Sequence, residues 1–228
     1  MAIERHAALV QYPSSDGEPM ADNTRQFQWI VTIQGGIDAL FKDDPAIFVA
    51  GDLLWYPVEG RPDIRRAPDA MVVFGRPKGH RPSYMQWAEG NIAPQVVFEV
   101  RSPKNSHAEL ERKRQFYETY RVEEYYLYDP DNGELMGWLR AGSRLSVIEQ
   151  IEGWVSPRLG VRFGLEDGEL LMANPDGSLF LSYVELARRR EAAEQAVSVE
   201  HERAEAEHER AERMAARLRE LGINPDTL

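Results

Sequence analysis

The 228-residue sequence has no cysteine, no apolar run long enough to cross a bilayer and no excess of positive charge. The absence of cysteine excludes a disulfide framework and any cysteine-ligated metal. Without about 18 consecutive apolar residues, no transmembrane helix is predicted. Asp and Glu number 38 against 27 Lys and Arg, so the net charge of −11 argues against binding of a polyanion through bulk charge. Because the N-terminus shows no basic stretch followed by an apolar segment, we expect a cytoplasmic protein.

Several familiar site motifs are also missing. The chain has no glycine-rich phosphate loop, no nucleophilic serine motif and no zinc-binding pattern. Its composition is nevertheless globular, with 43% apolar and 29% charged residues, and its length suits one domain with an appendage. Lysine is scarce and occurs only at Lys42, Lys78, Lys104 and Lys113. Each lysine therefore needs a specific explanation.

The main body alternates between helical and β-rich patterns. Apolar residues at helical spacing behind Asp22 or Asn23 predict a first helix, which Gly35 and Gly36 would weaken. A second helix begins after Ser106, which forms a capping-box pattern with Glu109. Central strands are predicted at 47–56, 67–74, 94–102 and 123–129, and hairpin strands at 134–140, 144–153 and 168–180. The pattern predicts an α/β fold whose sheet core is flanked by helices and carries an antiparallel hairpin extension.

The C-terminal part is one long helix by its composition. Residues 183–221 contain no Gly or Pro and are dominated by Ala, Glu and Arg. At 1.5 Å per residue such a helix is about 55–60 Å long. A seven-residue repeat places Val197, Ala204, Ala211 and Leu218 on one stripe, which fits either a coiled coil or a solvated helix held by Glu–Arg pairs. We expect a main domain over 1–182, this helix over 183–221 and a tail over 222–228, which Gly222 and Pro225 separate from the helix.

The second helix carries a lysine on its apolar face. Leu110, Lys113, Tyr117 and Tyr120 recur at steps of three and four residues, so they share the inward side of the helix. An inward lysine must either extend its amine to solvent or meet an anion, because a buried unpaired charge costs several kcal/mol. The wheel therefore predicts a partner for Lys113.

Two carboxylates in the predicted strands are candidates for that partner. Asp69 opens one strand after Pro68, and Glu99 interrupts the apolar run VVFEV where a buried strand would have Val or Ile. Two acids on neighbouring strands, with a lysine from the following helix, form a site for a hard divalent cation and an activated water. Oxygen ligands favour Mg²⁺ or Mn²⁺. The alternative is a buried structural ion pair beside an acid at the start of a strand.

The arrangement resembles the PD-(D/E)XK nuclease fold, and in detail the chain is similar to the Uma-two family of restriction endonucleases. This resemblance implies a restriction-endonuclease-like core and a metal-dependent endonuclease acting on DNA. It implies that Asp69 and Glu99 are metal ligands and that Lys113 is the catalytic lysine, with Glu18 and Asp52 as further candidate carboxylates. The resemblance extends over nearly the whole chain and rests on the segments SDGEP, AGDLLWY, PDAMVVF, SYMQWAEG, VVFEVRSPKNSHAELERKRQFY, VEEYYLYDP and LRELGINPD.

One position departs from the basic PD-(D/E)XK pattern. The lysine of that pattern stands two residues after the acid, where this chain has Arg101. Arginine stays protonated, so Arg101 could hold phosphate but could not act as a base. The resemblance and the helical wheel agree on Lys113 instead.

Positive charge gathers in residues 61–81, close to Asp69 in the sequence. Arg66 and Arg76 flank this acid, and a basic run there would suit the positioning of phosphate next to a cutting site. We therefore take Arg66, Arg76 and Arg101 as candidate substrate-binding residues. The alternative is a solvated loop whose arginines pair with acids elsewhere in the chain.

Two functions follow from these residues. The first is a metal-dependent endonuclease acting on DNA with Mg²⁺ or Mn²⁺. The second is a catalytically idle protein of the same fold that acts as a binding or regulatory module through its acidic body and long helix. The alanine-rich stripe, together with the tendency of nuclease domains of this fold to act in pairs, predicts a homodimer.

Overall fold

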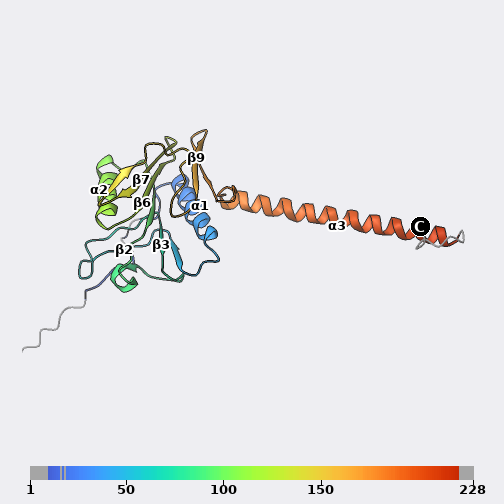
Figure 1. Cartoon of the computed structure of the whole chain (residues 1–228), viewed down its shortest axis with the longest axis horizontal. Helices are drawn as coiled ribbons and strands as arrows, with labels where there is room; N and C mark the ends of the chain where they lie inside the picture. The colour runs from blue at the N-terminus through green and yellow to red at the C-terminus, as the bar shows by residue number, and fades with distance from the viewer. Residues whose placement is uncertain (1–9, 16, 18, 221–228) are drawn as a thin grey trace, which may run out of the picture. The chain divides into compact units, whose positions relative to one another are not determined.

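The computed structural model describes residues 10–15, 17 and 19–220. Backbone contacts divide the chain into two units, Met1–Ser182 and Tyr183–Leu228 (Figure 1). The first unit holds all the strands and two α-helices, α1 (Thr24–Leu40) and α2 (His107–Thr119). The second unit holds α3 (Tyr183–Glu220).

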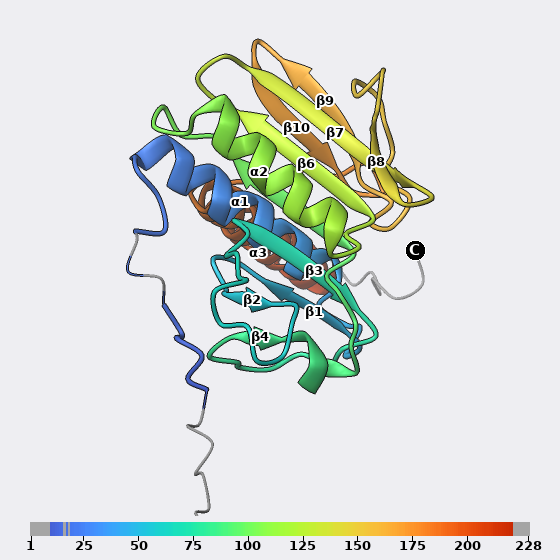
Figure 2. The ribbon, with the colours of Figure 1, turned by 90° about the vertical axis from the view of Figure 1, so that its left-hand side faces the viewer.

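A six-stranded sheet forms the centre of the first unit. The parallel pair β5–β6 is connected by α2, and the other neighbouring strands pair antiparallel. Figure 2 shows β6, β7 and β8 side by side along this sheet. The strands, in spatial order, are β1 (Ile47–Ala50), β3 (Ala70–Phe74), β5 (Val96–Val100), β6 (Glu124–Asp129), β7 (Glu134–Ala141) and β8 (Arg144–Val147). This mixed sheet with flanking helices confirms the predicted α/β fold class.

Two small sheets complete the unit. β2 (Trp55–Tyr56) pairs in parallel with β4 (Tyr84–Met85), which leads into the 3-10 helix η1 (Gln86–Glu89). β9 (Arg162–Glu166) and β10 (Glu169–Ala173) form an antiparallel hairpin. Several details differ from the sequence prediction. The run 47–56 is split between two sheets, β8 ends at Val147 and β10 at Ala173, and β4, η1 and β9 had not been predicted.

Local side-chain chemistry explains how the two helices of this unit begin. Asn23 caps α1, since its side-chain oxygen accepts a hydrogen bond from the backbone N–H of Gln26 (2.8 Å). Ser106 caps α2 in the same way through the N–H of Glu109 (3.2 Å), which confirms the capping residue predicted there.

Gly36, inside α1, has a packing role that the sequence did not reveal. A Cβ atom at this position would lie 2.2 Å from the ring of Phe180. The glycine therefore lets the segment after β10 approach the helix closely, which offsets its low helix propensity.

The central sheet is covered on both faces, and each face has its own core. On one face, α1 packs Ile30, Ile33 and Ile37 against the strands, together with side chains of the β9–β10 hairpin such as Phe163. On the opposite face, α2 packs Leu110 and Tyr117 over a second cluster, with the β2–β4 pair beside it. Every residue of β5 is buried, as expected for a strand covered on both sides. The face under α2 contains the polar residues of interest.

The second unit, α3, is a polar helix. None of its residues is buried, and Arg–Glu and His–Glu ion pairs three or four residues apart run along it, including Arg203–Glu207 and His208–Glu212. No helix among residues 10–15, 17 and 19–220 is long and apolar enough to cross a membrane. The predicted tail over 222–228, with its helix stop at Gly222 and Pro225, lies outside the described residues.

Candidate active site

Asp69 and Glu99 face each other across two neighbouring strands. The antiparallel register pairs Ala70 with Phe98 and Met71 with Val97, so its continuation by one residue sets Asp69 opposite Glu99. Directly opposed residues point to the same face of a sheet with Cβ atoms about 4.5–5.5 Å apart. Both side chains share the face of Val97, which α2 covers, and both are buried, at 8% and 2% exposure. The sheet thus places two carboxylates side by side.

α2 brings a cation onto this pair. The Lys113 ammonium donates to Glu99 Oε2 at 2.6 Å, and the Lys113 side chain is only 19% exposed. Tyr117, one turn further along the helix, donates its hydroxyl to Glu99 Oε1. The structure therefore supplies Lys113 with the anion that its inward position required. Sequence reasoning placed Tyr117 on the same face but assigned it no role at the carboxylate.

The burial of this group changes the ionisation of its members. Burial and the nearby charge of Glu99 raise the pKa of Asp69 well above its usual range, although Lys113 and the N–H of Val100, 2.6 Å from Oδ2, act in the opposite direction. Burial alone would lower the pKa of Lys113, but the charges of Glu99 and Asp69 outweigh it and raise that pKa. Lys113 is therefore an ammonium at neutral pH, beside two acids that repel each other.

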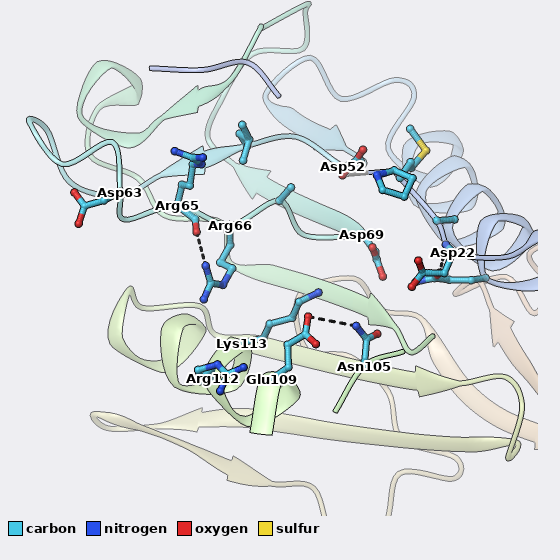
Figure 3. Close-up of a pocket in the computed structure, with 16 residues that line it drawn as sticks. Asp22, Asp52, Asp63, Arg65, Arg66, Asp69, Asn105, Glu109, Arg112 and Lys113 are labelled. Atoms are coloured by element: carbon cyan, nitrogen blue, oxygen red, sulfur yellow. Dashed lines mark hydrogen bonds between the residues drawn. The ribbon is translucent and has the colours of Figure 1, made fainter. Parts of the chain in front are cut away.

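Asp69 and Lys113 line a pocket of about 830 Å³, which is a size typical of ligand sites, whereas Glu99 and Tyr117 are not among the residues that line it. Figure 3 shows Asp69, Asp52 and Asp22 on one side of it, Arg65, Arg66 and Arg112 on the other together with Asp63, and Lys113 between them. The residues that line the pocket are Pro19, Met20, Ala21, Asp22, Gln26, Asp52, Leu54, Asp63, Arg65, Arg66, Ala67, Asp69, Asn105, Glu109, Arg112 and Lys113. The buried acid Asp69 thus adjoins a space open to a substrate.

The donor set suits a hard divalent cation. Each Glu99 oxygen accepts one hydrogen bond and keeps a lone pair, and Asp69 Oδ1 accepts none from any residue that the structure describes. A cation bound to both carboxylates would relieve the repulsion that raises the pKa of Asp69. No group of three His, Asp or Glu side chains in the described part of the chain is placed to hold a metal. Water and substrate oxygens would complete the coordination, as is common for Mg²⁺.

The remaining candidate residues are distributed unevenly. Arg66 lines the pocket, whereas Arg76 and Arg101 do not, because Arg76 pairs with Glu89 (2.8 Å) and Arg101 with Asp129 (2.6 Å). Asp52 lines the pocket with its backbone in the left-handed region, at φ 48°, and its charge adds to the factors that raise the pKa of Asp69. Glu18 lies outside the described residues.

Arg65 and Arg112 line the pocket as well and were not among the predicted site residues. Arg65 precedes the candidate Arg66, and Arg112 precedes Lys113 on α2. The sequence signal for Arg65 was its place in the basic run 61–81, and that for Arg112 was its adjacency to Lys113.

Comparison with known proteins places this architecture in a family. The family model Uma2, described as "Putative restriction endonuclease", matches residues 14–175, so the chain belongs to this family of nuclease-like proteins. Among solved structures, the chain is similar to a crystal structure titled as a putative nuclease belonging to DUF820 from Anabaena variabilis ATCC 29413. The two share 15% identity with a TM-score of 0.45 over 61% of this chain and 74% of that one. A search of curated proteins gave no match.

Proposed function

We propose that the protein is a metal-dependent endonuclease that hydrolyses phosphodiester bonds of DNA. The observation that carries this proposal is the buried Asp69–Glu99 pair with Lys113 bound to Glu99, of which Asp69 and Lys113 line an open pocket, in a chain of the Uma2 family. Perturbed acids with a specific charged partner in a cleft are a mark of functional sites. Asp69, Glu99 and Lys113 are then the catalytic residues.

The roles of the three side chains follow from their positions. Asp69 and Glu99 would hold Mg²⁺ or Mn²⁺ between adjacent strands. Such an ion, when bound, polarises a phosphoryl oxygen and lowers the pKa of a coordinated water. Lys113, whose ammonium donates to Glu99 Oε2 at 2.6 Å, would orient or deprotonate the attacking water and stabilise negative charge that develops on the phosphate.

The proposal is tested by incubation of supercoiled plasmid DNA with the full chain in Mg²⁺, in Mn²⁺ and in EDTA. We expect nicked and then linear products in the presence of either metal and intact plasmid in EDTA. The same assay on single-stranded DNA and on RNA establishes the substrate class. Absence of divalent-dependent cleavage of all these nucleic acids over a broad range of salt and pH would contradict the proposal.

One observation favours the second function, a nuclease-fold binding module without activity. Both Glu99 oxygens are already engaged, by Lys113 and by Tyr117, as they would be in a purely structural network. Binding of Mn²⁺ in solution separates the two functions. A nuclease requires metal binding that Asp69→Asn weakens, whereas an idle module requires none.

We also propose that the protein acts as a homodimer, with α3 as one candidate contact. Val197 of its stripe (71% exposed) and Met214 beside the stripe (57% exposed) are apolar side chains that a second copy would cover. We expect truncation after Glu185 to leave a folded body with a lower association state, measured by light scattering. Equal masses per chain for the full and truncated proteins would exclude α3 from the interface, and a monomeric full chain at high concentration would reject the dimer.

A further inference from the structure

Arg65, Arg66 and Arg112 line one side of the pocket, and none of them forms an ion pair with any residue in the described part of the chain. The acids Asp63 and Glu109 also line the pocket, but Asp63 pairs with Arg61 and Glu109 accepts a hydrogen bond from Asn105. Three positive charges are thus available at the same pocket for an anion from outside.

The rest of the basic segment behaves differently. Arg61 pairs with Asp63 at 2.7 Å and Lys78 with Asp38 at 2.8 Å. Arg76 and Arg81 share Glu89, at 2.8 and 2.6 Å. The fold therefore pairs four of the six Lys and Arg residues of 61–81 with acids and leaves unpaired only the two that face the pocket.

Neutral groups hold two of these arginines in position. Arg65 Nη1 donates to the carbonyl of Pro62 (2.8 Å), and Arg66 Nη1 donates to the carbonyl of Arg65 (2.9 Å). The Arg66 guanidinium also lies 5.4 Å from the centre of the Phe116 ring. These contacts fix the direction of the side chains without cancelling their charge, so less conformational entropy is lost when an anion binds.

Arg112 approaches from the other wall, since α2 carries it directly before Lys113. It is exposed, and its side chain forms no hydrogen bond with any described residue. Glu109 is an acid on the same wall. It accepts a hydrogen bond from Asn105 at 3.4 Å and forms no ion pair with an arginine of the described residues. Figure 3 shows the three guanidinium groups spread along the side of the pocket away from Asp69 and Asp52, with Asp63 on the same side.

We propose that Arg65, Arg66 and Arg112 form a phosphate-binding subsite that holds the backbone of a nucleic acid next to the Asp69–Glu99 pair. The inference rests on the proposed function for the identity of the polyanion. A phosphodiester that approaches two buried acids is repelled, and cations on the opposite side of the pocket offset this repulsion. Guanidinium groups suit the role because they bind phosphate oxygens in a bidentate geometry. The subsite explains how an acidic protein holds a polyanion at one place.

The experiment measures nucleic-acid binding without cleavage. Fluorescence anisotropy of labelled duplex DNA, single-stranded DNA and RNA is recorded in EDTA over a range of salt concentrations. The test variant is Arg65→Gln/Arg66→Gln/Arg112→Gln. The matched control is Arg121→Gln/Arg144→Gln/Arg162→Gln, which removes the same charge from exposed arginines outside the pocket that form no ion pair within the described residues. Circular dichroism checks that both variants are folded.

We expect the test variant to bind at least about 100-fold more weakly than the wild type, since removal of each charge-assisted hydrogen bond to phosphate costs about tenfold or more. The slope of log affinity against log salt should fall by about two to three on duplex DNA, because each neutralised phosphate contributes about 0.9. The control variant should stay within a few-fold of the wild type. Equal weakening of the two variants, no weakening of either, or no binding by the wild type would overturn the subsite.

The outcomes separate this inference from the proposed function. If the arginines control binding but the full chain cleaves nothing in Mg²⁺ or Mn²⁺, the subsite stands and the nuclease proposal fails. If the full chain cleaves DNA and the test variant binds and cleaves as the wild type does, the nuclease proposal stands and the subsite fails.

Discussion

Asp69→Asn and Glu99→Gln are each expected to lower divalent-dependent cleavage of DNA by at least about 1000-fold. Each substitution removes one of the two charges that hold the cation. The bound cation contributes several kcal/mol of transition-state stabilisation, and a loss of every 1.4 kcal/mol lowers the rate about tenfold. Asp69→Asn is the cleaner of the two, because the amide oxygen can still accept the hydrogen bond from Val100. Plasmid nicking under single-turnover conditions measures the effect.

The matched control for this prediction is Glu109→Gln. Glu109 lines the same pocket, and its substitution by Gln removes one negative charge, as each test substitution does. It lies on α2, however, and not at the strand positions of Asp69 and Glu99. We expect its cleavage rate to stay within about tenfold of the wild type, as for a residue that leaves the metal in place. Retention of wild-type cleavage by Asp69→Asn would show that the acid pair is structural.

The second large effect concerns stability. Lys113→Met is expected to lower the free energy of unfolding by about 3 kcal/mol, because it leaves the Glu99 carboxylate, 2% exposed, without its cation. The double variant Lys113→Met/Glu99→Gln should recover most of this loss, since no charge then remains unpaired. Urea unfolding of the wild type, both single variants and the double variant gives the coupling energy from one cycle.

The double-mutant cycle is informative whether or not it shows coupling between Lys113 and Glu99. A coupling of about 1–3 kcal/mol that favours the pair would show that Lys113 and Glu99 compensate each other in solution. A loss below about 0.5 kcal/mol for Lys113→Met, with no coupling, would contradict the ion pair. Cleavage should be absent in Lys113→Met and in the double variant alike, so recovery of stability without recovery of activity would separate the structural part of the pair from the catalytic part.

Much of the central arrangement could be read from local patterns. The inward wheel position of Lys113 and the acid within VVFEV were enough to predict that this helix would face that strand, because both periodicities are fixed by the backbone. The capping residue Ser106 was equally local. The catalytic role of these side chains remains a prediction.

What could not be read depends on contacts between distant parts of the chain. The pairing of Arg76 and Arg81 with Glu89, and of Arg101 with Asp129, joins residues that no periodicity relates. A basic run in the sequence thus looks like one surface, although the fold pairs most of its cations with acids. The split of the run 47–56 could not be predicted either. Its two apolar segments join different sheets, and the turn between them, where Asp52 has a left-handed backbone, interrupts no periodicity in the sequence.

The register between β3 and β5 limits how this protein can change during evolution. Residues can be inserted at the exposed loop residues Gly79 and His80, in the connection between β3 and β5, at a modest entropic cost, since each doubling of a flexible loop costs only about 0.6 kcal/mol. A single residue inserted within β3, in contrast, would turn Asp69 to the opposite face of the sheet, under α1. We therefore expect length variation to be tolerated in this loop and not within the two strands.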